Sequence, residues 1–99
     1  KRFLALYRIL PQHAVAALLM RSGPLGAAQA VALIPELLEE LRRAGRNRKT
    51  LETMSPHDIV AHGKAQLLRL GAIQTKGGVM FAKKDALLRY CAAPVFETA

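Results

Sequence analysis

Hydrophobic residues recur at helical spacing along the first part of the chain. Up to position 21 this pattern predicts a short lead-in helix and then a helix from about Leu10 to Arg21. Pro11 falls in the first turn of the second of these helices, where proline is tolerated. The run Ser22-Gly23-Pro24 predicts the end of this helix, because glycine followed by proline stops a helix.

A second, longer helix is predicted from about Gly26 to Ala44. Pro35 lies inside it and removes one backbone hydrogen bond, so we expect a kink or a break before Glu36. Gly45 closes the helix. The apolar stripe that should be buried consists of Ala30, Ile34, Leu37, Leu38 and Leu41.

Residues 46–54 show no helical spacing and are interpreted as a loop, after which a third helix begins. Ser55 is the expected N-cap, Pro56 fits the first helical position and Asp58 fits the third. Gly71 is the expected stop of this helix.

A β-hairpin is predicted after the third helix. Its strands are residues 72–75 and 79–82, joined by Lys76-Gly77-Gly78, because two glycines supply the positive φ that a tight turn needs. A last short helix is expected from Lys83 to Ala92, ending near Pro94.

These elements predict a mainly α fold, namely a small helical domain of four to five helices with one β-hairpin, as a single domain over residues 1–99. Hydrophobic residues make up 52% of the chain and charged residues 22%, which is typical of a globular protein and excludes a disordered one. Because the chain begins at Lys1 rather than at methionine, we expect a segment of a longer protein. The core is expected to contain Ile34, Leu37, Leu41, Ile59, Leu67, Leu70 and Leu87.

Few residues could carry catalysis or bind a metal. His57 and His62 are five positions apart, whereas two metal ligands on one helix prefer a spacing of four. His13 stands at a helix start and is interpreted as a capping or surface histidine. The single cysteine, Cys91, is expected to be a small buried thiol in a reducing compartment. No nucleophile motif or phosphate-binding loop is present, so the sequence predicts no active site, no metal site and no cofactor.

Positive charge is the main surface feature of the chain. Fifteen Lys and Arg against seven Asp and Glu give a formal net charge of +8. Such a surface attracts the phosphates of nucleic acid, of anionic lipid or of a phosphorylated substrate, although a solvated face or a face docked on an acidic domain would look the same. The candidate phosphate- or lipid-binding residues are Arg42, Arg43, Arg46, Arg48 and Lys49, and a second basic group, Lys76, Lys83, Lys84 and Arg89, surrounds the hairpin.

The order of the elements suggests one class of function. Three helices followed by a hairpin with a basic tip are the order of a winged-helix nucleic-acid-binding module, with residues 57–71 as recognition helix and residues 76–78 as wing. Two features disagree with this reading. The link before the third helix is about ten residues, whereas helix-turn-helix units use three or four. The third helix also carries few outward residues that could read bases.

Three segments carry a resemblance to a known family. In residues 7–19 a proline-containing turn leads into an Ala/Leu-rich helix, residues 58–68 hold Asp-Ile-Val ahead of Leu-Leu, and residues 86–92 contain Leu-Leu-Arg-Tyr-Cys. In order and spacing these segments resemble the region beyond the catalytic domain of membrane-associated glycerol-3-phosphate acyltransferases, and of the related dihydroxyacetone-phosphate acyltransferases. Cys91 stands where that family usually has a second tyrosine.

The resemblance implies a non-catalytic C-terminal accessory region. Acyl transfer from acyl-CoA or acyl carrier protein to glycerol 3-phosphate, in phospholipid synthesis, would be performed upstream. The family's catalytic histidine is followed five positions later by an aspartate, and no such pair exists here, so no catalytic residue is carried over. The implied partners are an upstream catalytic domain and an anionic membrane surface, at the cytoplasmic face of a membrane. The winged-helix alternative implies nucleic acid and a cytoplasmic location.

Overall fold

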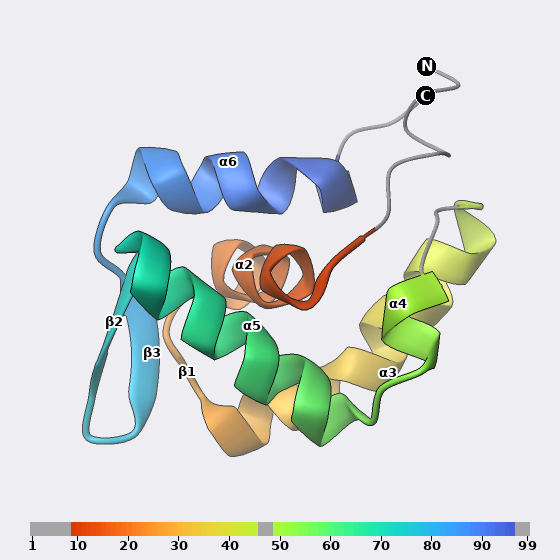
Figure 1. Ribbon diagram of the computed structural model, residues 1–99, viewed down its shortest axis with the longest axis horizontal. Helices are drawn as coiled ribbons and strands as arrows, with labels where there is room; N and C mark the ends of the chain where they lie inside the picture. Colours follow the sequence, from red (N-terminus) through yellow and green to blue (C-terminus); the bar gives the residue numbers. More distant parts are fainter. Residues whose placement is uncertain (1–8, 46–48, 97–99) are drawn as a thin grey trace.

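Helix α2 (Pro11–Ser22) is the centre of the fold. In a computed structural model that describes residues 9–45 and 49–96, α2 packs against both α5 (Pro56–Leu70) and α6 (Asp85–Phe96) (Figure 1). Its middle turns are buried on all sides, and the small side chains of Ala14, Ala16 and Ala17 are fully buried. Alanine favours a helix and lets neighbouring helices come close, which suits a helix covered from two directions. The predicted bounds of this helix are confirmed to within one residue.

Helix α3 (Ala27–Arg43) continues through Pro35 as one element, so of the expected kink or break the break is wrong. Pro35 is exposed. A proline keeps a helical φ and removes one hydrogen bond, and on the solvent side water can satisfy the carbonyl that loses its donor.

The segment predicted as a loop contains helix α4 (Lys49–Glu52), which corrects the interpretation of residues 46–54. Leu51 is fully buried and anchors this single turn. The hydroxyl of Thr53 donates to the carbonyl oxygen of Thr50 at 2.8 Å and closes its end. One turn is too short to show helical periodicity in a sequence.

The predicted hairpin is confirmed as strands β2 (Ile73–Lys76) and β3 (Val79–Ala82). Gly77 and Gly78 form its turn with φ of 59° and 80°, values that favour glycine. A third strand, β1 (Leu25–Gly26), was not predicted. It pairs antiparallel with β3, so that the sheet order is β1-β3-β2.

Within the described residues the chain has five helices and one three-stranded antiparallel sheet, and the mainly α fold class is confirmed. The order α2-β1-α3-α5-β2-β3 is that of a winged-helix domain, in which a short strand after the first helix joins the hairpin. Helix α4 is inserted between the second and third helices of that order, and α6 follows the hairpin (Figure 1).

Three details of the predicted helices are wrong. Leu70 is 51% exposed. The chain turns at Gly71, which has a left-handed conformation, and the residues that follow it, Ala72 and Ile73, are buried in the core instead of Leu70. Leu87 is half-buried, and its neighbour Leu88 is the core residue. The last helix does not end near position 94 but continues to Phe96. Most of the expected lead-in helix lies outside the described residues. The other predicted core residues are buried, namely Ile34, Leu37, Leu41, Ile59 and Leu67.

Candidate functional site

The basic cluster predicted from the sequence is described only in part. Arg42 and Arg43 lie in the last turn of α3 and Lys49 begins α4, whereas Arg46 and Arg48 fall outside the described residues. The Arg42 guanidinium donates to both carboxylate oxygens of Glu39, through Nε at 3.1 Å and through Nη2. These hydrogen bonds, with the charge of Glu39, raise the pKa of Arg42. Part of the positive charge of this cluster is therefore already balanced.

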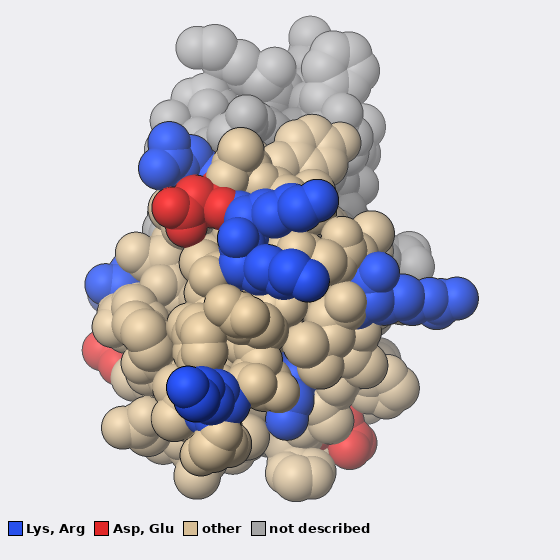
Figure 2. All heavy atoms as spheres, turned by 90° about the vertical axis from the view of Figure 1, so that its left-hand side faces the viewer, with Lys and Arg blue, Asp and Glu red and all other residues tan. Residues whose placement is uncertain are grey.

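A second set of cations lies at the opposite end of the molecule, around the hairpin. Lys76 is at the hairpin turn, Lys83 and Lys84 form the link from β3 to α6, and Arg89 follows on α6. Helix α5 adds Lys64 and Arg69 to the basic group that the sequence predicted here. Figure 2 shows this end of the molecule, with Lys and Arg side chains spread across it. We call these six residues the basic hairpin face.

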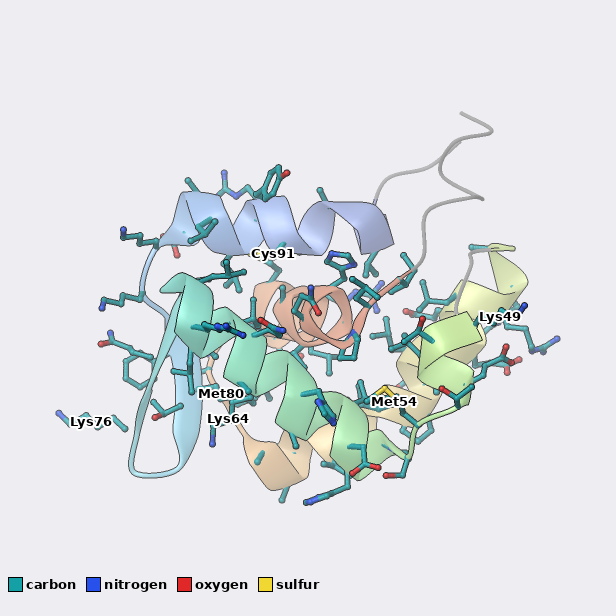
Figure 3. The ribbon with its side chains drawn as sticks, in the orientation of Figure 1. Lys49, Met54, Lys64, Lys76, Met80 and Cys91 are labelled. Carbon is teal, nitrogen blue, oxygen red and sulfur yellow. The ribbon has the colours of Figure 1, made fainter. Side chains whose placement is uncertain are left out.

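Between α3 and α5 lies an open apolar groove of about 380 Å³, which we call the α3–α5 groove. Lys64 and His57 supply its polar atoms, and Figure 3 shows Lys64 on the side of α5 that faces the sheet. Leu68 is 40% exposed in this groove. The groove was not predicted from the sequence, although the spacing of Ala61, Ala65 and Leu68 places them on one side of α5, away from the core stripe. Its other lining residues are Ala27, Val31 and Val60.

The three histidines have structural or surface positions. Nδ1 of His13 accepts a hydrogen bond of 3.0 Å from the amide of Leu10, which caps the start of α2 and confirms the capping interpretation. Burial lowers the pKa of His13. His57 and His62 are both exposed on α5. In the described part of the chain, no group of three His, Cys, Asp or Glu residues is arranged to hold a metal ion.

Cys91 is 6% exposed on the inner side of α6, as expected for a buried thiol. Burial raises the pKa of its thiol, so the reactive thiolate is disfavoured. The arrangement therefore offers two surfaces, one apolar and one basic, and no cluster of reactive side chains among residues 9–45 and 49–96.

The helix that a winged-helix module would place in the major groove of DNA is poorly suited to phosphate contact in its first half. The first two turns of α5 carry Asp58 and no Lys or Arg. No helix in the described ranges has the length and apolar character needed to cross a bilayer. Comparisons of the chain with protein-family models, with curated proteins and with solved structures gave no match.

Proposed function

We propose that the chain is the non-catalytic C-terminal accessory region of a glycerol-3-phosphate acyltransferase, whose acyl transfer is performed by an upstream catalytic domain that takes acyl-CoA or acyl carrier protein. One observation supports this most. The three segments that resemble the family lie far apart in sequence, yet their described residues fall almost entirely within α2, α5 and α6, and α2 packs directly on the other two (Figure 1). The residues that carry the resemblance therefore belong to three helices that pack together, rather than to three separate parts of the molecule.

One close contact within this unit joins two of the resembling segments. Gly63 of α5 lies against α2, where an added Cβ would stand 2.5 Å from both the carbonyl oxygen of Pro11 and Cγ2 of Val15. The helices could not approach this closely with any other residue at position 63.

We assign contact with the catalytic domain to the α3–α5 groove. Its lining is apolar and open, and its alanines allow a helix of the partner to come close. Arginine at Ala65 would obstruct the groove without disturbing the core, because Ala65 is exposed. Gln66→Arg adds the same charge beside the groove and serves as the control.

The test uses the parent chain and measures acyl transfer to glycerol 3-phosphate. We expect activity in the intact parent, a large loss on deletion of this region and a loss in Ala65→Arg, with Gln66→Arg near the parent level. A parent that has no such activity, or that keeps full activity after the deletion, would contradict the proposal.

Binding of duplex nucleic acid by a winged-helix module is the second candidate. Strand β1 favours it, because this strand completes the three-stranded sheet of that domain order. The acidic first turn of α5 opposes it. The candidate predicts salt-dependent binding of random duplex DNA that weakens on substitution of Lys76 and Lys64.

A further inference from the structure

The charges of the described chain are divided unequally between its two ends. Residues 59–96 hold the six cations of the basic hairpin face and a single acid, Asp85, whereas the described residues before them hold four cations and five acids. Two of those four, Arg21 and Arg42, pair with Glu40 and Glu39. The positive field is therefore concentrated at the hairpin end.

The side chains of the basic hairpin face are available to a partner. Five of the six are exposed and Lys64 is half-buried. Within the part of the chain that the structure describes, none of the six forms an ion pair. The face spans the end of α5, the hairpin turn and the start of α6, so its charge covers a broad end of the molecule (Figure 2).

Two exposed apolar side chains are neighbours in sequence of cations of this face. Leu70 follows Arg69 and is 51% exposed, and Tyr90 follows Arg89 and is 77% exposed. The carbonyl oxygen of Ala72 accepts hydrogen bonds from the backbone amides of Lys83 at 2.9 Å and Lys84 at 3.3 Å. The basic link between β3 and α6 is thereby held next to the end of α5 that carries Leu70.

We propose that the basic hairpin face binds the surface of a bilayer that contains anionic phospholipid. Lys and Arg meet the headgroups, while leucine and tyrosine suit the boundary between headgroups and acyl chains. A DNA duplex fits less well, because the first turns of α5 lack the cations that a helix in the major groove uses. The inference stands on charge and exposure alone and does not depend on the acyltransferase proposal.

The test compares two triple variants that remove the same charge from different ends. Lys76→Gln, Lys83→Gln and Lys84→Gln neutralise three of the six cations of the basic hairpin face. Arg42→Gln, Arg43→Gln and Lys49→Gln, in the cluster predicted from the sequence, are the matched control. Binding of the 99-residue chain is measured by co-sedimentation with vesicles of equal parts phosphatidylcholine and phosphatidylglycerol, with vesicles of phosphatidylcholine alone, and with random duplex DNA. Circular dichroism verifies that each variant is folded.

We expect binding to the anionic vesicles alone. Each cation near such a surface contributes about fivefold to the partition coefficient, so the hairpin variant should lose about a hundredfold and the control far less. Binding should weaken strongly between about 0.15 M and about 1 M salt, as the screening length falls from about 8 Å to about 3 Å.

Three results would overturn the inference, namely equal losses in both variants, a larger loss in the control, or tight DNA binding without vesicle binding. The acyl-transfer assay of the parent chain is a separate measurement, so either proposal can fail while the other stands.

Discussion

At the scale of single residues, Gly63 has the least room for an added side chain among the glycines of the chain. An added Cβ would meet the backbone of Pro11 and the side chain of Val15 at 2.5 Å, and backbone cannot move aside as a flexible side chain can. We predict that Gly63→Ala lowers the free energy of unfolding by about 1–3 kcal/mol, as expected for overpacking. Urea denaturation followed by circular dichroism measures this.

The control for this prediction is Ala65→Ser, which adds one heavy atom on the exposed side of the same helix. Its effect should stay within about 0.5 kcal/mol. If the free energy of unfolding of Gly63→Ala were as high as that of Ala65→Ser, α2 and α5 would have to lie further apart than described.

His13 links stability to pH. Burial lowers its pKa from the ordinary value of 6.5, and Nδ1 must be unprotonated to accept the hydrogen bond from Leu10. The unfolded chain therefore takes up a proton at a higher pH than the folded chain. The contribution of His13 is present above about pH 6.5 and is lost as the pH falls through its lowered folded pKa.

Thermal unfolding between about pH 7 and pH 5 measures this effect. His13→Gln should keep the cap and remove this part of the pH dependence, because Gln29 accepts from the amide of Gly26 in the same way at the start of α3. His62→Gln, at an exposed position, is the control substitution. An unchanged pH profile in His13→Gln would exclude His13 as its source.

At the scale of elements, two leucines of α5 test which side of the helix is buried. Leu67 is fully buried and Leu70 is 51% exposed. We predict that Leu67→Ala costs about 2–5 kcal/mol of unfolding free energy and that Leu70→Ala costs much less. Urea denaturation measures both losses. Equal losses of unfolding free energy in the two variants would mean that Leu70, at the end of α5, is buried.

Elements with strong local signals were predictable from the sequence. Ser55 caps α5 as expected, with its hydroxyl oxygen accepting from the amide of Asp58 at 3.2 Å, and the left-handed Gly71 ends the helix. Strand β1 could not be predicted, because a two-residue strand exists through its pairing with β3 rather than through its own sequence. The exposure of Leu70 was not predicted for a similar reason, because it depends on the turn at Gly71 that brings Ala72 and Ile73 into the core instead.

Of the candidate surfaces, only the basic residues were predictable from the sequence, and their arrangement in space was not. The sequence indicated basic groups near positions 42–49 and around the hairpin, but it could not show that Glu39 pairs with Arg42. It also could not show that Lys64 and Arg69 of α5 join the hairpin cations at one end of the molecule. The α3–α5 groove needs two helices side by side, and no pattern within one helix contains that information.

At the scale of the whole molecule, the uneven distribution of charge over the described residues gives the domain an electric dipole moment. Among the described residues the positive excess lies at the hairpin end, which should orient the molecule before contact with an anionic surface, and this steering weakens as salt is added. The apolar α3–α5 groove shares Lys64 with the basic hairpin face but is otherwise lined by different residues. The two proposals therefore place a protein partner and an anionic surface on largely different residues of one domain.

The position of Cys91 also provides a natural probe of how the molecule opens. Helices α5 and α6 both pack against α2, so the apolar side of α6 belongs to the same hydrophobic core as α5. We therefore expect α6 to separate from α2 only when the whole domain unfolds. We predict that a thiol reagent labels this single cysteine at a rate set by global unfolding, with the same dependence on urea as the circular dichroism signal. Labelling that is fast and independent of urea would show instead that α6 detaches while α2 and α5 remain packed.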